Sequence, residues 1–188
     1  MTDFYLDPVL YNGRPADEAG RPDKEIRTYD LLNKLNIPFQ RVDHAPAATT
    51  EVCHEIDRLL ATEVCKNLFL CNAQKTAFYL LMMPGNKRFK TAALSKQIES
   101  SRLSFAEPEF MDEFLDITPG SVSVMGLMND RNNRVRLLID HEVADNHEYV
   151  GCHPCINTSS LSLRTRDILE VFLPYVKHDY TFVELPTV

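Results

Sequence analysis

The chain has 188 residues, which predicts about one domain, and its net charge is −7 at neutral pH. Hydrophobic residues make up 44% and charged residues 25%, so intrinsic disorder and a disulfide scaffold are excluded as the main state. An isoelectric point near 5.3 excludes a generally basic nucleic-acid binder, although an acidic body can still carry a local basic patch.

The sequence also limits where the protein works. Its longest apolar run, Ala77 to Met83, is far shorter than the ~20 residues that span a bilayer. The N-terminus lacks the basic start and apolar core of a secretory signal. Five cysteines in a chain of this size indicate reduced thiols. We therefore expect a cytoplasmic protein that uses no membrane, no cofactor and no metal.

Apolar spacing and turn residues predict the elements along the chain. Residues 1–23 are rich in proline, glycine and asparagine and predict an arm, and Asp23 is positioned to cap the helix that follows. In chain order we expect a helix over 24–36, a strand over 39–43, a helix over 50–60, strands over 66–71 and 76–83, helices over 91–99 and 107–115, strands over 121–128 and 134–140, a helix over 142–146, a strand over 161–164, a helix over 166–175 and a strand over 180–185.

Two adjacent strand pairs, 66–71 with 76–83 and 121–128 with 134–140, are separated by polar turns and predict hairpins. Because helices and strands otherwise alternate, we expect one α/β domain with a mixed sheet over residues 24–188.

Lys66 is the first residue that could carry chemistry. It starts an apolar strand, from which its ammonium can reach into a cleft and hold a phosphate or a carbonyl oxygen. The alternative is a solvated lysine at the edge of a strand.

The segment 151–157, Gly-Cys-His-Pro-Cys-Ile-Asn, is the second such feature. Glycine and proline define a loop, and His153 and Asn157 supply hydrogen-bonding groups; the alternative is an ordinary surface loop. Cys152 and Cys155 have the C-x-x-C spacing of zinc and thiol-redox sites. No further pair with suitable spacing accompanies them, so we expect small buried side chains. A nucleophilic pair of Cys152 with His153 is disfavoured, because adjacent strand residues point to opposite faces.

The turn Pro119-Gly120-Ser121-Val122-Ser123 is the third feature, because consecutive backbone N–H groups can bind an anion or a carbonyl oxygen. The alternative is a plain turn into a strand. Residues 75–102 form the fourth, with six basic side chains against Glu99 alone. Such a local excess suits contact with phosphates, and the alternative is a solvated face.

Six stretches together resemble the YbaK/prolyl-tRNA-synthetase-associated editing domain family, in particular its free-standing branch that deacylates alanyl-tRNA(Pro). They are Leu35-Asn36-Ile37-Pro38-Phe39, Cys65-Lys66-Asn67-Leu68-Phe69-Leu70, Lys90-Thr91-Ala92-Ala93-Leu94-Ser95, Leu103-Ser104-Phe105-Ala106, Pro119-Gly120-Ser121-Val122-Ser123, and Gly151-Cys152-His153-Pro154 with Asn157-Thr158. The resemblance covers about residues 28–173 and leaves out the first 23.

The resemblance implies a curved mixed sheet surrounded by helices and hydrolysis of the ester that joins a wrong amino acid to tRNA. Lys66 matches the family's essential lysine, and Gly120 and Ser121, with Val122 and Ser123, match the loop around the aminoacyl group. His153 matches a pocket residue, with Gly151, Pro154 and Asn157 shaping that wall. One departure is Val124, which stands where the family's loop has proline.

This resemblance also implies partners. We expect the acceptor end of aminoacylated tRNA, with Lys87, Arg88, Lys90 and Lys96 near its phosphates, a transient contact with prolyl-tRNA synthetase, and no DNA.

The mechanism expected from this resemblance needs no covalent nucleophile, because an aminoacyl ester is already reactive. Lys66 would hold the terminal phosphate or the carbonyl region, the 120–123 amides would bind the carbonyl, and a ribose hydroxyl of the tRNA would orient water. A pocket too small for proline would spare the correct product.

Two other functions stay open at this point. One is a binding protein that recognises the aminoacyl group without cleaving it, to which the loss of the loop proline is the only pointer. The other is a thiol or zinc protein built on Cys152 and Cys155.

Overall fold

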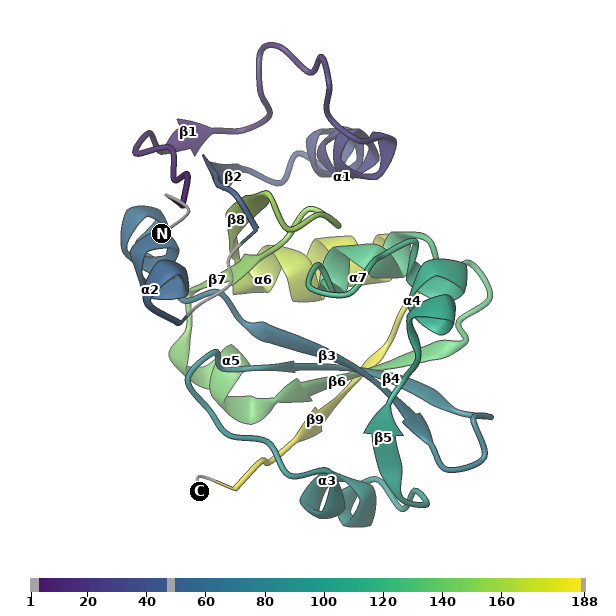
Figure 1. Ribbon diagram of the computed structural model, residues 1–188. Helices are drawn as coiled ribbons and strands as arrows, with labels where there is room; N and C mark the ends of the chain where they lie inside the picture. Colours follow the sequence, from purple (N-terminus) through teal and green to yellow (C-terminus); the bar gives the residue numbers. More distant parts are fainter. Residues whose placement is uncertain (1–3, 47–49, 187–188) are drawn as a thin grey trace.

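The computed structural model describes residues 4–46 and 50–186 (Figure 1). The helices are α1 (Asp23–Lys34), α2 (Thr50–Leu60), α3 (Thr91–Gln97), α4 (Pro108–Leu115), η1 (Val124–Met128), α5 (His141–Asn146), α6 (Thr165–Asp167), η2 (Ile168–Phe172) and α7 (Leu173–Tyr175). The strands are β1 (Tyr11–Asn12), β2 (Phe39–Asp43), β3 (Lys66–Asn72), β4 (Phe78–Met83), β5 (Leu103–Phe105), β6 (Val135–Asp140), β7 (Tyr149–Cys152), β8 (Ser159–Arg164) and β9 (Tyr180–Val183). No helix within the described ranges is both long and apolar enough to cross a bilayer.

The strands form two sheets. One has four antiparallel strands in the order β1-β2-β8-β7. The other has five in the order β5-β3-β4-β6-β9, in which β5, β3 and β4 are antiparallel while β4, β6 and β9 are parallel. The expected α/β class with a mixed sheet is therefore confirmed, with the strands divided between two sheets.

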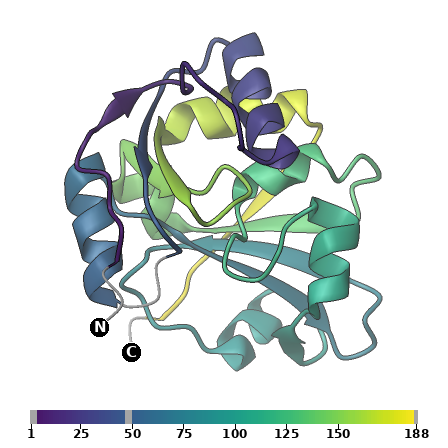
Figure 2. The same cartoon turned by 45° about the horizontal axis from the view of Figure 1, so that its top comes forward.

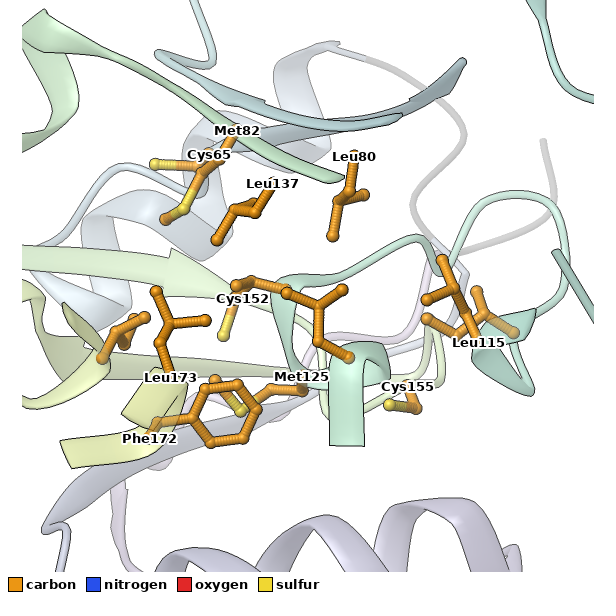
Figure 3. Packing of buried hydrophobic residues seen from close by; sticks show 14 of the residues in the cluster. Cys65, Leu80, Met82, Leu115, Met125, Leu137, Cys152, Cys155, Phe172 and Leu173 are labelled. Atoms are coloured by element: carbon orange, nitrogen blue, oxygen red, sulfur yellow. The ribbon is translucent and has the colours of Figure 1, made fainter. Parts of the chain in front are cut away.

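The main core lies between the two sheets. Alternate residues of β3, Phe69 and Cys71, meet Leu161 and Leu163 of β8 there, together with α4, η1 and the helix formed by α6, η2 and α7. Figure 3 shows Cys152 and Met125 near Phe172 and Leu173 in this core, with Cys65 beside Met82.

A second cluster lies on the other face of the five-stranded sheet, where Leu94 of α3 packs on Leu70 and Leu81. Figure 1 shows α3 on this side of the sheet and α4, α6 and α7 on the opposite side.

The N-terminal arm packs against the four-stranded sheet. Its β1 pairs with β2, and Leu6 bridges His44. Phe4 and Leu6 pack against the cluster that α2 forms with Val42, and Figure 2 shows this segment running alongside α2. Arg21 binds the carboxylates of Glu25 and Asp43 and so ties the end of the arm to α1 and β2. The arm is thus part of the packed structure, and the boundary at residue 23 remains a prediction.

Several predicted elements are confirmed. β2 and α2 have the expected bounds, and β3 and β4 form the expected hairpin. The helix expected over 166–175 is one continuous segment from α6 to α7 with a π-helical turn, η2, at its centre.

The strand predicted over 121–128 is wrong, and so is its hairpin with 134–140. Val124–Met128 form a 3₁₀ helix, and β6 lies parallel to both β4 and β9. The error has a physical reason: η1 is buried on nearly every side, so its apolar run carries no helical period. Two further differences concern ends of elements. Asp23 lies in the first turn of α1 and Pro22 is the N-cap residue. The expected loop at 151–157 begins within a strand, because β7 includes Gly151 and Cys152.

Candidate active site

The two sheets are joined where the segment before β3 runs parallel to β7. Val64 bridges Gly151: the Cys65 N–H donates to the Gly151 carbonyl at 2.9 Å, and the Gly151 N–H donates to the Glu63 carbonyl at 2.9 Å. Lys66 and His153, two predicted site residues from distant parts of the chain, each follow this junction by two residues, Lys66 at the start of β3 and His153 directly after β7.

Only glycine fits at position 151. A Cβ atom there would lie 2.7 Å from the Val64 Cα, closer than real Cβ atoms approach backbone, and 3.0 Å from the Glu63 carbonyl oxygen. Gly151 therefore holds the junction closed, and this is a structural reason for the glycine that the sequence resemblance assigns to the pocket wall.

Lys66 is exposed at the start of β3. Its Nζ donates to the Lys87 carbonyl at 3.0 Å, and the side chain borders a groove of about 690 Å³. We call this the basic groove; it is lined by Lys66, Leu68, residues 87–92 and Phe105. No hydrogen bond or ion pair among the described residues joins Lys66 to the 120–123 turn.

Lys87 differs from its basic neighbours. Its side chain is only 8% exposed and its Nζ lies 2.8 Å from Asp140 and 3.0 Å from Glu142. Burial acts to lower the pKa of Lys87, but these two carboxylates raise it more, so the side chain stays charged. Lys87 is therefore committed to an internal ion pair and is a poor phosphate contact. Arg88, Lys90 and Lys96 are exposed, as the prediction requires.

The 120–123 turn is shaped by Gly120, whose φ of +88° lies in the left-handed region. Ser121 closes the turn: its N–H and its hydroxyl both donate to the Thr118 carbonyl, at 3.1 and 2.8 Å, and its side chain is fully buried. Ser121 thus acts within the turn rather than on a ligand. For the N–H groups of Gly120, Val122 and Ser123, no acceptor lies within reach in the described part of the chain.

The departure at Val124 is compensated by its neighbours. Val124 is fully buried as the first residue of η1, and the Met125 N–H donates to the Ser123 hydroxyl at 3.2 Å. Proline at this position would fix the entry into a helix; here the serine cap does so. The missing proline therefore gives no support to a binding protein without catalysis.

Asn157 connects the turn to the 152–158 loop. A Cβ on Gly120 would lie 3.3 Å from the Asn157 Nδ2, so the side chain of Asn157 packs closely against the Gly120 backbone. On the core side, the Ser123 side chain lies close enough to the Cys152 thiol to act on its pKa. The structure therefore brings together three sequence-predicted features, the turn, Asn157 and the end of β7. Pro154 is buried within the same loop.

Two histidines lie at this end of β8. The His153 Nδ1 lies 2.9 Å from the Ser159 carbonyl and so carries a proton, which leaves Nε2 as an acceptor without a partner among the described residues. The His44 Nε2 lies 2.8 Å from the Ser160 hydroxyl, and the two imidazole rings are 6.2 Å apart. Burial lowers the pKa of His153 and of His44, so both rings are neutral at pH 7.

His44 and Ser160 were missed by the sequence reasoning. His44 follows β2, and Ser160 shares one face of β8 with Ser162, a run of small polar side chains that could have marked a polar wall. No spacing in the chain connects residues 44 and 160, because their meeting depends on the pairing of β2 with β8.

The thiol alternative is contradicted by burial. Cys152 and Cys155 are both fully buried, and burial raises the pKa of each thiol to about 12. A redox thiol needs a lowered pKa. Within the described ranges no three histidine, cysteine or acidic side chains come together as a metal site.

Comparison with known proteins identifies the family. The aminoacyl-tRNA editing domain family matches residues 44–171, about two thirds of the chain. The chain belongs to this family. The resemblance seen in the sequence is confirmed, and with it the enzyme class, an aminoacyl-tRNA deacylase.

Two relatives of this editing protein show how far the similarity extends. The prolyl-tRNA editing protein ProX of Acetoanaerobium sticklandii is 29% identical over 140 residues, which are 74% of this chain and 85% of ProX. The prolyl-tRNA synthetase associated domain-containing protein 1 of Danio rerio is 27% identical over 150 residues, 79% of this chain and 80% of that protein.

A solved structure described as a candidate trans-editing enzyme for prolyl-tRNA synthetase superposes with a TM-score of 0.65. It covers 89% of this chain and 99% of its own, at 15% sequence identity, and so supports the fold.

Proposed function

We propose that this editing protein acts in trans on mischarged tRNA(Pro) and that its substrate is alanyl-tRNA(Pro). The family supports the ester hydrolysis, and the names of ProX and of the Danio rerio relative point to prolyl-tRNA. The choice of alanine rests on the sequence resemblance described above.

The observation that carries this proposal is the set of N–H groups at Gly120, Val122 and Ser123, which have no acceptor among the described residues. Attack of water on the ester places negative charge on the carbonyl oxygen. Fixed amide donors at that oxygen stabilise the charge without reorganising, and removal of one such donor typically slows catalysis about 10²- to 10³-fold. The turn thus supplies the main catalytic interaction in this proposal.

The other residues position the substrate. Lys66 holds the phosphate of the terminal nucleotide, and a ribose hydroxyl of that nucleotide orients the attacking water. His153 offers its unpartnered Nε2 to the α-ammonium group of the amino acid, which a neutral imidazole can accept and an imidazolium would repel. The lowered pKa of His153 keeps the ring in the neutral form that this contact needs.

Selectivity for alanine over proline follows from the size of the amino-acid pocket. Gly151 and the buried Pro154 leave no slack in the wall that carries His153. We infer that the space bounded by this wall and by Val122 accepts the methyl side chain of alanine and excludes the ring of proline. Rejection by size lets the enzyme spare the correct product, as a second sieve does.

The test compares hydrolysis of alanyl-tRNA(Pro) and prolyl-tRNA(Pro) by the wild type, by Lys66→Ala and by Lys34→Ala. Lys34 is a matched control, because it is also exposed but lies at the end of α1 beside Tyr175. We expect the wild type and Lys34→Ala to release alanine only, and Lys66→Ala to lose this activity.

Three results would count against the proposal. Equal hydrolysis of both esters would remove the size selection, and full activity of Lys66→Ala would remove the role of Lys66. Binding of alanyl-tRNA(Pro) without hydrolysis would favour a protein that only recognises the aminoacyl group. If seryl- or cysteinyl-tRNA were cleaved instead, the editing function would stand with another substrate.

A further inference from the structure

Phe105 is an aromatic side chain that the fold leaves open. It is 61% exposed, although it lies in a strand whose other apolar residue, Leu103, is only 2% exposed. In the pairing of β5 with β3, Phe105 stands opposite Leu70, so its side chain shares the sheet face of Lys66, Leu68 and Leu70. Helix α3 covers Leu70 and Leu103 through Leu94, whereas Leu68 is only partly buried.

This open part of the sheet face is the basic groove. Its apolar side is formed by Leu68, Phe89 and Phe105, and its charged side by Lys66, Arg88 and Lys90. These three cations are exposed, and no carboxylate of the described residues lies within ion-pair distance of them. Lys87 lies in the same loop as Arg88 and Lys90, but the carboxylates of Asp140 and Glu142 neutralise its charge. The positive charge of the other groove cations is left uncompensated.

An aromatic face beside unpaired cations suits one kind of ligand. Single-stranded nucleic acid offers unstacked bases for the ring and phosphates for the cations, while a duplex hides the faces of its bases. The volume of about 690 Å³ is in the range of sites that enclose a small ligand.

We propose that Phe105 is a stacking platform for a nucleobase of the unpaired 3′ end of the tRNA, whose phosphates bind Lys66, Arg88 and Lys90. This inference rests on the proposed function for the direction in which the 3′ end of the tRNA runs along the groove. When Lys66 binds at the terminal adenosine, Phe105 meets a nucleotide that precedes it in the tRNA. The reason is distance: Leu70, the partner of Phe105, lies four residues beyond Lys66 along β3, a rise of about 13 Å. The stacked base is therefore one of the two cytosines that precede the terminal adenosine.

The experiment uses an uncharged acceptor-stem microhelix that ends in CCA, with pyrrolocytosine at either cytosine, so that binding is measured without hydrolysis. We expect the wild type to change the fluorescence of one of these probes. Phe105→Ala should abolish the change and weaken binding about 5- to 150-fold, the range for loss of one stacked base. Phe105→Tyr should keep both signals. Tyr175→Ala removes an aromatic that is 46% exposed but lies on α7, and it should behave as the wild type.

Several outcomes would overturn the inference. Unchanged affinity and fluorescence in Phe105→Ala would show that no base stacks on the ring, and so would a wild type that does not bind the microhelix. A Phe105→Leu variant that keeps the fluorescence change would show a merely apolar contact. A blunt duplex that competes as well as the CCA-ended microhelix would mean that the groove reads paired phosphates. Because hydrolysis of alanyl-tRNA(Pro) by the wild type is assayed separately, failure of the stacking and failure of the editing function give different results.

Discussion

Replacement of Gly151 by alanine tests whether the junction between the sheets organises the site. The new Cβ would meet the Val64 Cα at 2.7 Å and the Glu63 carbonyl oxygen at 3.0 Å, and neither backbone atom can move alone. The strands must therefore separate. This separation weakens the two hydrogen bonds of 2.9 Å that join Gly151 to Cys65 and to Glu63.

The expected loss of stability can be worked out from these contacts. Two hydrogen bonds contribute about 1 kcal/mol each, and forcing an extra carbon into a packed region costs about 1–3 kcal/mol. Gly151→Ala should thus lower the free energy of unfolding by about 3–5 kcal/mol, a large part of the ~5–15 kcal/mol of a typical domain. Because Lys66 and His153 each follow the junction by only two residues, hydrolysis should fall as well, even where the variant is still folded.

Urea unfolding followed by circular dichroism measures this loss. Gly20→Ala is the control, because Gly20 has a φ of +79° but no atom within 4 Å of the added Cβ, so it carries only the backbone strain of about 1–2 kcal/mol. The argument from close approach would be refuted by a Gly151→Ala variant whose free energy of unfolding lies within about 0.5 kcal/mol of the wild-type value, which is about the precision of such extrapolations.

Three further predictions concern the turn, the histidines and the thiols. Gly120→Ala strains a φ of +88° and brings a Cβ within 3.3 Å of the Asn157 Nδ2, so kcat/KM should fall about 10²-fold; normal hydrolysis would show that the amides of this turn do not hold the carbonyl. Burial lowers the pKa of His153 in the folded protein, so the unfolded chain binds more protons and the free energy of unfolding should decrease as the pH falls below about 6.5. His153→Gln should reduce this dependence in urea titrations below about pH 6.5, with the remainder due to His44, and an unchanged slope would assign it to other groups. Cys53 alone among the five thiols is exposed, so Ellman's reagent should titrate one thiol in the native protein and five after unfolding; fast reaction of a second thiol would contradict the burial.

The local elements were predictable wherever one face of the element is buried. The helix from Asp23 carries an apolar stripe on one side, and the polar turn after β3 indicated the hairpin with β4. The prediction failed at η1, whose residues are buried on nearly all sides and therefore carry no period, and at β7, whose Gly151 and Cys152 gave the appearance of a loop.

The candidate site divides in the same way. Lys66, Gly120 and His153 were found from residue types and from the resemblance to the editing family. Their neighbours could not be found, because His44 reaches Ser160 through the pairing of β2 with β8, and Lys87 reaches Asp140 through the parallel pairing of β4 with β6. Contacts of this kind depend on residues far apart in the chain, and no local pattern records them.

The sequence by itself therefore determined the fold class, the family and the residues that carry its motifs, because periodicity and short motifs are local properties. The tertiary structure alone decided which charges remain free. It buried Lys87 between two carboxylates, left Lys66, Arg88 and Lys90 without carboxylate partners in the described part of the chain, and exposed Phe105 beside them. The physical reason is that the energy of a charge or an aromatic ring depends on what surrounds it, and those surroundings come from strands that meet only in the folded protein.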